Sequence, residues 1–488
     1  MSDTPPPEPL FDRTPAFAVG GPADGPPDPV VYDGTLRALR QRTVNFAAKR
    51  LVDMMFVTGL DRATAERHLR WRPAAIPGGL AARPQPDPGI AAVLDAALAD
   101  GRITIETDAA DRKVAICWID PTFGPPIAAH AIARPGYGGI LLGPDASPRF
   151  DPAPIARAAG TPGHAWPLGD AVAPPPPSPA LADAAAALFA GSPGIYGVMA
   201  ATPNRVLFER YSSFGAPDRP TPSWSMTKAI TCTLIGRLIA EGWLHSVHDP
   251  APAPLWRDPR AAQHRITLDH LLRMRSGLAF PVLTEDGRAR LGFENSAVYQ
   301  DAADAFDAAQ RSIVATEPGS VFRYVNSGPN VLGAILRDAI ERRGLPYHAT
   351  VYGLLADRLG MRSYQHSADI VGNLIASGAG FATLRDYAKL GVLYVQDGMW
   401  AGERLLPPGW ADYALTATHT GSSYAACFRT NADRLFRDLP ADTAWASGAS
   451  DQRVFILRRQ RIVVAVANET DHPMDLAALG RFVAAAVG

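Results

Sequence analysis

Apolar residues recur at helical spacing in the segment that follows the first 35 residues. They lie three or four positions apart, which is the spacing of one face of an amphipathic helix. The segment reads "TLRALRQRTVNFAAKRLVDMMF", with apolar residues at Leu36, Leu39, Val44, Phe46, Ala47, Leu51, Met54 and Met55. We expect a second helix to begin near Asp61 and Ala63.

The pattern then changes to that of strands. In "ITIETDAADRKVAICWID", two β-rich runs flank a four-residue polar turn, which predicts a hairpin. A third run, "IAAHAIARPGYGGILLG", is expected to continue the same sheet.

The rest of the chain also shows helix and strand patterns, in a different order. After a proline run at 174–179, "ALADAAAALFA" predicts a helix and "GIYGVMAATPNRVLFERYS" predicts a hairpin. A mostly helical middle follows, and the chain closes with two β-rich runs in "RVFILRRQRIVVAVANE" and a helix in "MDLAALGRFVAAAV". Strands before and after a helical middle predict an α+β domain with a helical insertion.

Shifts in composition divide the chain into four parts. Residues 1–35 are rich in Pro, Gly and Asp, which predicts a disordered tail. Residues 36–143 are expected to form an N-terminal α/β extension that docks on the main domain, since they show no convergent polar cluster of their own. Residues 144–179 are expected to be a proline-rich, stiff linker, and residues 180–488 the main domain.

Composition and charge narrow the classes of partner. The chain has 488 residues and a net charge of -1, which argues against nucleic acid because phosphate binding usually needs a basic excess. No apolar run is long enough for a membrane span, and we see no secretory signal. The three cysteines are far apart and odd in number, which favours reduced core residues. We therefore expect a cytoplasmic protein with a small-molecule partner, and its oligomeric state stays open.

The stretch "SWSMTKAI" holds Ser225 and, three positions later, one of only four lysines, Lys228. The residues behind them have helical apolar spacing, so Ser225 is expected in the first turn of a largely buried helix. Residues three apart share a helix face, which lets hydroxyl and amine meet. A lysine whose pKa is lowered by burial can take a proton from serine. Alone, the S-x-x-K pattern also fits a surface serine and a solvated lysine.

Two further segments carry candidate chemistry. Tyr324 and Asn326 lie in "FRYVNSGPNVLG", where a phenol can relay a proton and an amide can hold a carbonyl. Small residues in "WASGASDQRVFIL" lead into a strand and would let a substrate approach its edge closely. Taken singly, the first segment is better explained by a buried tyrosine and a turn asparagine, and the second by an ordinary turn before a strand.

Together and in this order, the three segments resemble the serine β-lactamase and penicillin-binding-protein superfamily. The likeness is greatest to its class C-like branch, especially 6-aminohexanoate-dimer hydrolase (nylon oligomer hydrolase)-like proteins and family VIII esterases. "LDHLLRMRSGLAF" and "WASGASDQ" resemble further segments of that branch. The resemblance covers roughly residues 180 to 488. It implies a β-lactamase/transpeptidase-like antiparallel sheet flanked by helices.

The resemblance also implies roles for the catalytic residues. Ser225 would be the acylated nucleophile, and Lys228 would accept its proton. Tyr324 would carry the proton to the leaving group. The chain would then hydrolyse an ester or amide bond through an acyl-enzyme, with no metal and no cofactor.

The same resemblance implies the binding groups. Asn326 would orient the substrate together with Ser447 and Gly448. The backbone N–H groups of Ser225 and Ala449 would form the oxyanion hole.

Two departures from the family pattern bear on the substrate. Ala446 stands where relatives often have a lysine, and Asp451 stands where a glycine is expected before Gln452. Without that lysine we expect a poor β-lactamase, unless Arg453 replaces it; in a regular strand Arg453 would face the other side. A D-amino peptidase or β-lactamase of the same fold, or a catalytically silent binding protein on this scaffold, remain alternatives.

Overall fold

The computed structural model describes residues 28–69, 96–121, 124–145, 147–157, 164–169, 171–284, 286–292, 296–301, 303–419, 422–468 and 472–488. Most of the expected N-terminal tail, residues 1–27, lies outside the described residues. Just before the tail's expected end at residue 35, strand β1 (Tyr32–Asp33) pairs in parallel with β9 (Leu278–Leu283). The Gly34 N–H extends this pairing with a 2.7 Å hydrogen bond to the carbonyl of Leu283.

A six-stranded antiparallel sheet forms the centre of the molecule, with strand order β16-β17-β18-β19-β6-β7. Both hairpins expected in this part of the chain are confirmed, since β6 pairs with β7 and β18 pairs with β19. The strands are β6 (Ile195–Ala201), β7 (Val206–Tyr211), β16 (Arg429–Thr430), β17 (Ala444–Ser447), β18 (Arg453–Leu457) and β19 (Ile462–Asn468).

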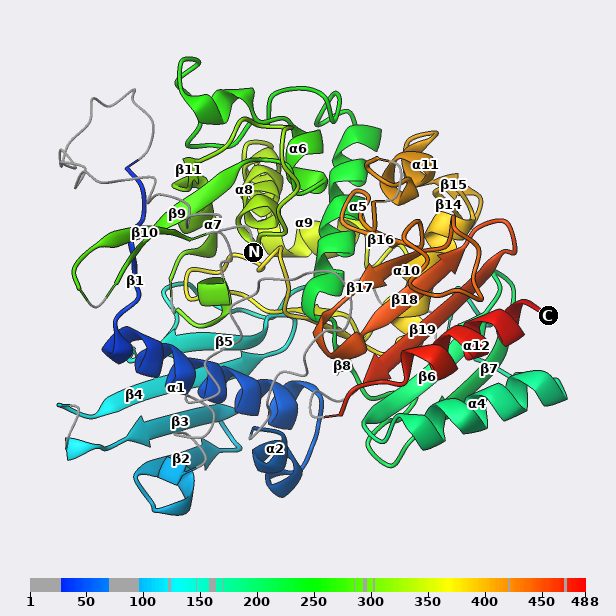
Figure 1. Ribbon diagram of the computed structural model, residues 1–488, viewed down its shortest axis with the longest axis horizontal. Helices are drawn as coiled ribbons and strands as arrows, with labels where there is room; N and C mark the ends of the chain where they lie inside the picture. The colour runs from blue at the N-terminus through cyan, green and yellow to red at the C-terminus, as the bar shows by residue number, and fades with distance from the viewer. Residues whose placement is uncertain are drawn as a thin grey trace, which may run out of the picture.

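Helices cover both faces of this sheet (Figure 1). On one face, α4 (Pro179–Gly191) and α12 (Leu476–Val487) lie side by side. On the other face lie α5 (Thr227–Ala240) and α10 (Leu384–Val395), with α8 (Ser327–Glu341) beyond them. Strand β19 is buried along its whole length, with alternate residues in the two cores. The fold is therefore the expected α+β arrangement, an antiparallel sheet flanked by helices with a helical insertion.

The insertion between β7 and β16 also contains short strands that the sequence did not predict. They form two small sheets and a hairpin around the helices. The further elements of the insertion are β8 (Thr221–Pro222), η3 (Trp224–Met226), η4 (Ala262–Arg265), α6 (Leu268–Leu272), β10 (Ala289–Gly292), η5 (Ser296–Tyr299), α7 (Ala305–Gln310), β11 (Ile313–Val314), α9 (Tyr347–Leu354), β12 (Gln365–His366), β13 (Gly380–Ala382), β14 (Met399–Trp400), β15 (Glu403–Arg404) and α11 (Trp410–Leu415). A short 3-10 turn, η6 (Ala449–Asp451), follows β17.

The N-terminal extension is a second, smaller sheet with a helix across it. The expected hairpin and its continuation are confirmed as an antiparallel sheet, β2-β3-β4-β5. Helix α1 packs on that sheet and runs into a turn of π-helix, η1, before α2. The elements are α1 (Leu36–Val52), η1 (Asp53–Val57), α2 (Arg62–Leu69), β2 (Ile103–Asp108), β3 (Lys113–Trp118), β4 (Ile127–Arg134) and β5 (Gly138–Gly143).

Polar contacts join the extension to the main domain. The Arg42 guanidinium lies 2.9 Å from the Asp301 carboxylate, and the Asn45 amide donates a 2.7 Å hydrogen bond to the carbonyl of Gln300. The segment after the extension is also packed, since the Trp166 indole donates to the carbonyl of Thr202 at 2.9 Å. These contacts support docking of residues 36–143, although the four domain boundaries stay predictions.

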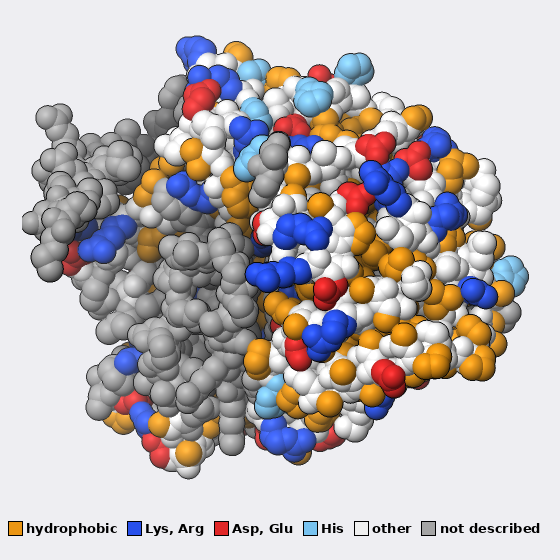
Figure 2. Space-filling view, turned by 45° about the vertical axis from the view of Figure 1, so that its right-hand side comes forward, with side chains coloured by type: hydrophobic (Ala, Val, Ile, Leu, Met, Phe, Trp, Pro, Cys, Tyr) orange, Lys and Arg blue, Asp and Glu red, His pale blue; other side chains and the backbone are white. Residues whose placement is uncertain are grey.

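The described surface mixes all classes of side chain. Basic, acidic and apolar side chains are interspersed over the described part of the face in Figure 2, in keeping with the net charge of -1. Within the ranges that the structure describes, no helix combines the length and hydropathy that a membrane crossing needs.

Candidate functional site

The start of α5 is fixed by the short sheet of β8 and β13. The Ser223 N–H donates to the carbonyl of Gly380 at 2.7 Å, and the Gly380 N–H lies 3.0 Å from Ser223 Oγ and 3.1 Å from Thr227 Oγ1. A Cβ at residue 380 would lie only 2.9 Å from Thr227 Oγ1, so this close approach requires glycine. Ser225 therefore sits in η3, one short turn before α5, rather than inside the helix.

Lys228 lies in the first turn of α5, and its side chain is buried, with 1% of the residue exposed. Its Nζ lies 3.0 Å from Ser225 Oγ, 2.8 Å from Asn326 Oδ1 and 2.6 Å from the carbonyl oxygen of Ser377. A neutral amine has two N–H donors and one lone pair. Nζ donates to all three oxygens, and in its neutral form Lys228 would keep the bonds to Asn326 and Ser377 and turn its lone pair to the Ser225 hydroxyl. This arrangement suits Lys228 as the acceptor of the serine proton.

Tyr324 lies on another side of Lys228, with its ring centroid 4.9 Å from Nζ. It comes from the loop before α8, and Asn326 occupies the N-cap position of that helix. The Tyr324 ring packs against a small cluster that includes Met274, Val325 and Tyr424. The fold therefore brings Tyr324 and Asn326 of the second motif to Lys228 of the first, which also contacts Ser225.

The segment "LDHLLRMRSGLAF" (268–280) packs against the loop that carries Tyr324. The Arg323 N–H donates to the carbonyl of Met274 at 2.8 Å, and Met274 belongs to the cluster against which Tyr324 packs. This contact gives a physical role to a segment that sequence comparison identified only by likeness.

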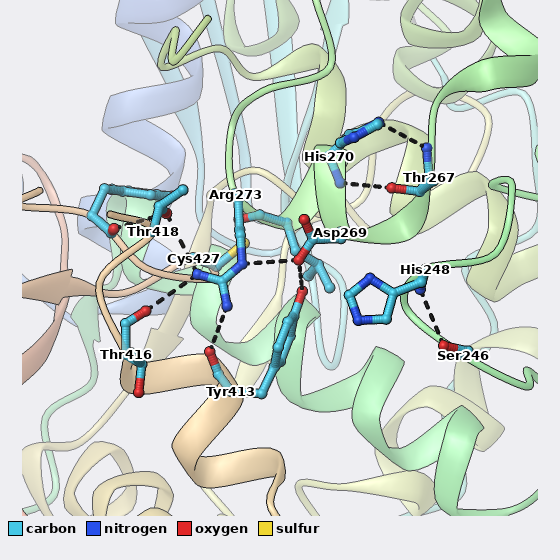
Figure 3. Close-up of polar contacts among 12 residues, drawn as sticks. Ser246, His248, Thr267, Asp269, His270, Arg273, Tyr413, Thr416, Thr418 and Cys427 are labelled. Atoms are coloured by element: carbon cyan, nitrogen blue, oxygen red, sulfur yellow. Dashed lines mark hydrogen bonds and ion pairs between the residues drawn. The ribbon is translucent and has the colours of Figure 1, made fainter. Parts of the chain in front are cut away.

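A polar network joins this segment to Tyr413 in α11 (Figure 3). Arg273 contacts the Asp269 carboxylate at 2.8 Å and donates to the carbonyl of Tyr413 at 2.9 Å, while the Tyr413 hydroxyl donates to Asp269 at 2.8 Å. Burial, reinforced by Asp269, raises the pKa of Tyr413, so the phenol stays a donor. Cys427 is held there too, by a 2.9 Å bond from its N–H to the carbonyl of Leu272.

The third motif meets the nucleophile segment at Gly448. A Cβ there would lie 2.2 Å from the carbonyl oxygen of Ser223, so only glycine allows this approach. Ser447 ends β17 and Ala449 begins η6, so both lie within one residue of the contact. The fold thus brings the third motif beside Ser225, as the oxyanion-hole and substrate-binding assignments require, while those assignments remain proposals.

The two departures in the third motif have structural explanations. Asp451 adopts a left-handed φ of 64°, a conformation usual for glycine and tolerated by Asp, and its carboxylate lies 2.8 Å from Arg453. Arg453 is 6% exposed and lies over the Phe436 ring on the α4/α12 side of the sheet. Ala446 is buried in the core on the other side. Arg453 therefore does not replace the missing lysine.

Sequence reasoning missed three residues at the site. The Tyr299 hydroxyl lies 3.0 Å from Ser377 Oγ and 3.4 Å from Asn326 Oδ1. The Arg429 guanidinium carbon lies 5.6 Å from the Tyr324 ring centroid and 5.4 Å from that of Tyr424. The small-residue run "ASGAG" at 376–380 is a signal that could have identified Ser377. Tyr299 and Arg429 carry no local sequence signal.

Other site types are not evident in the described residues. His245 is exposed, and its Nδ1 lies 3.1 Å from the Asp249 carboxylate. Within the described parts of the chain, no three His, Cys, Asp or Glu side chains lie close enough to hold a metal ion.

Solved structures with a similar fold, and one family model, match this chain. The putative 6-aminohexanoate-dimer hydrolase from Bacillus anthracis is 18% identical, with a TM-score of 0.50 over 62% of this chain and 81% of that chain. A penicillin-binding protein homologue from Caulobacter crescentus is 19% identical, with a TM-score of 0.50 over 65% and 98%. These likenesses show the fold, and no curated protein matches the sequence. The family model described as "Beta-lactamase" matches residues 181–488, more than half of the chain. The chain therefore belongs to the beta-lactamase family.

Proposed function

We propose that this protein is a serine hydrolase that cleaves an ester or amide bond through an acyl-enzyme intermediate on Ser225. The observation that carries the proposal is the 3.0 Å contact between Ser225 Oγ and the buried Lys228, whose Nζ also donates to Asn326 Oδ1 and to the carbonyl of Ser377. Membership of a family of serine hydrolases supports it.

The reaction would proceed in two steps. Lys228 takes the proton of Ser225 as Oγ attacks the substrate carbonyl, and the N–H groups of Ser225 and Ala449 stabilise the negative charge on the carbonyl oxygen. Tyr324 donates its phenol proton to the leaving alcohol or amine and regains a proton from Lys228, which leaves the acyl group on Oγ. Lys228 then takes a proton from a water molecule that attacks the acyl-enzyme ester, and this proton returns to Ser225 Oγ as the acid leaves.

A fluorophosphonate probe tests the nucleophile. Ser225 should be phosphonylated in the wild-type chain, and Ser225→Ala should abolish both labelling and turnover of p-nitrophenyl acetate. The matched control is Ser367→Ala, which removes another buried serine that lies beside a lysine, with Ser367 Oγ 3.1 Å from Lys49 Nζ. Full labelling of Ser225→Ala would contradict the proposal, and a wild-type chain that takes no label would favour a silent binding protein.

Arg429 favours a second candidate, a peptidase or β-lactamase whose substrate carries a carboxylate. Its guanidinium lies beside the Tyr324 ring, on the strand next to β17, so it can supply the cation that Ala446 does not. A hydrogen bond to a charged group contributes about 1.5–3 kcal/mol.

Comparison of nitrocefin with p-nitrophenyl acetate separates the two candidates. If the carboxylate is recognised, Arg429→Leu should lower kcat/KM for nitrocefin about ten- to a hundredfold and leave the acetate ester unchanged. If the neutral ester is preferred and Arg429→Leu affects both substrates equally, the result supports a hydrolase of esters or amides that does not recognise a substrate carboxylate.

A further inference from the structure

Trp224, which directly precedes Ser225, has a left-handed backbone conformation, with a φ of 45°. A residue with a Cβ adopts such a φ only where the surrounding contacts enforce it, because its Cβ crowds the following carbonyl oxygen. The peptide that joins Trp224 to Ser225 also carries the Ser225 N–H, one of the two proposed oxyanion donors. The contacts that hold Trp224 therefore also set the direction of that N–H.

The main domain fixes the backbone around this turn. The Ser223 N–H donates to the carbonyl of Gly380 at 2.7 Å, and Ser223 Oγ donates to the carbonyl of Trp224 at 3.0 Å. The Met226 N–H then donates to the carbonyl of Ser223 at 3.0 Å. These hydrogen bonds anchor the backbone and leave the Trp224 side chain to be held by other contacts.

Helix α1 of the N-terminal extension supplies contacts to that side chain. The Arg50 guanidinium carbon lies 5.0 Å from the centroid of the Trp224 ring, and the Phe46 ring centroid lies 6.2 Å from it. Residues four apart share one face of a helix, so both side chains approach the indole together. Arg50 is 8% exposed, and a cation–π contact is strongest where water is excluded.

A second contact joins the extension to the same turn. Phe381 belongs to β13 of the main domain, yet its buried side chain packs in one hydrophobic cluster with residues of α1, β3 and β4. In the strand pair β8–β13, Phe381 lies opposite Pro222, which is three residues before Ser225. The strand pair that leads into the nucleophile turn therefore rests on the core of the extension.

We propose that the N-terminal extension is part of the catalytic unit, and that Arg50 positions Ser225 through the ring of Trp224. Arg50 acts through Trp224 rather than on the reacting atoms, so it is a positioning residue. The proposal rests on the proposed function, since it takes Ser225 as the nucleophile and its N–H as an oxyanion donor.

Arg50→Met and Trp224→Gly test the contact from its two sides. Methionine keeps an unbranched side chain without the guanidinium, and glycine accepts the left-handed φ but has no ring. Each variant should lower kcat for p-nitrophenyl acetate about tenfold, less than the 10²–10³-fold cost of removing an oxyanion donor outright. The KM should change less than about twofold, because the oxyanion contact strengthens only in the transition state. The rate at which a fluorophosphonate labels Ser225 should fall with kcat.

The double variant shows whether the two side chains act through one contact. If they do, Arg50→Met combined with Trp224→Gly should lower kcat about tenfold, rather than the roughly hundredfold expected of independent effects. Trp224→Phe keeps a ring beneath the guanidinium and should stay within about threefold of the wild type.

The matched control is Arg40→Met. Arg40 lies on the same helix, and its guanidinium carbon is 5.6 Å from the centroid of the Trp118 ring, so this stack lies within the extension. Its loss should leave kcat per folded molecule unchanged, with the folded fraction measured by urea unfolding.

The outcomes separate this proposal from the proposed function. If the wild type is labelled and cleaves the acetate ester, the positioning role alone is wrong when Trp224→Gly keeps full kcat, when Arg50→Met loses no more than Arg40→Met, or when the losses in the double variant multiply. If the wild type is neither labelled nor active on any ester, both proposals fall.

Discussion

Two buried lysines in this molecule each lie beside a serine, in two different regions. Lys228 Nζ is 3.0 Å from Ser225 Oγ in the main domain, and Lys49 Nζ is 3.1 Å from Ser367 Oγ at the boundary with the extension. They are 1% and 6% exposed. Distance and burial therefore do not distinguish them.

The remaining contacts of each lysine make the difference. Lys49 has a carboxylate, Asp53, one helical turn away, whereas Lys228 Nζ contacts an amide oxygen, a carbonyl oxygen and a hydroxyl. Burial lowers the pKa of Lys49 and raises that of Asp53, and their attraction opposes both shifts. Lys389 repeats the structural pattern, 2.8 Å from Asp386. We infer that a lysine paired with a carboxylate has a structural role. A lysine that contacts amide, carbonyl and hydroxyl oxygens is the better candidate for a catalytic base.

Replacing each lysine by methionine should separate the two regions most strongly. Lys228→Met should lower kcat/KM for p-nitrophenyl acetate by up to about 10⁴-fold, because no base remains for Ser225. Lys49→Met should instead reduce the free energy of unfolding by about 3–5 kcal/mol, because Asp53 is left buried without its partner. Urea unfolding and steady-state kinetics measure both effects. An equal loss of turnover per folded molecule in the two variants would contradict the distinction.

The two tyrosines near Lys228 sharpen the comparison within the site. Tyr324→Phe should lower kcat by about 10²–10⁴-fold if the phenol carries the proton. Tyr299→Phe removes hydrogen bonds that hold Ser377 and Asn326 and does not remove a proton carrier. It should therefore lower kcat less than Tyr324→Phe does. Kinetics on a slow amide are the measurement, and a loss under threefold in Tyr324→Phe would count against its role.

In the region of Lys49, pH should act on stability rather than on catalysis. His366, next to Ser367, is buried, and burial lowers its pKa from 6.5 to about 4. Below pH 6.5 the His366 imidazole binds a proton in the unfolded chain, whereas in the folded chain it stays neutral until the pH nears 4. The contribution of neutral His366 is therefore complete above pH 6.5 and is lost as pH falls toward 4. The loss amounts to about 3 kcal/mol at 1.36 kcal/mol per pH unit.

His366→Gln isolates this effect. The stability difference between the wild type and the variant should shrink by about 3 kcal/mol from pH 7 to pH 4. Asp369, whose pKa burial raises to about 6, acts in the opposite direction but is present in both chains and cancels. A difference that stays constant with pH would show that His366 takes up its proton in the folded chain.

Local patterns predicted most of the main domain and the centre of the site. The β-rich runs of β6, β7, β18 and β19 and the spacing from Ser225 to Lys228 are read over a few residues, and the structure confirms the elements and the contact. Tyr299 and Arg429 were missed because their places depend on packing between distant segments. Phe46 was read only as part of a helix face, since its neighbour Trp224 is far away in the sequence.

The pairing of β1 with β9 has a consequence for the order of synthesis. The extension is made first, yet it is anchored by residues that emerge much later, as with Asn45 and Gln300, which are 255 positions apart. At about 5–20 residues per second, the ribosome needs roughly 13–50 s to supply these partners. During that interval the side of α1 that later meets the main domain has no covering segment from its own chain. The nascent extension is thus a point at which a chaperone can act.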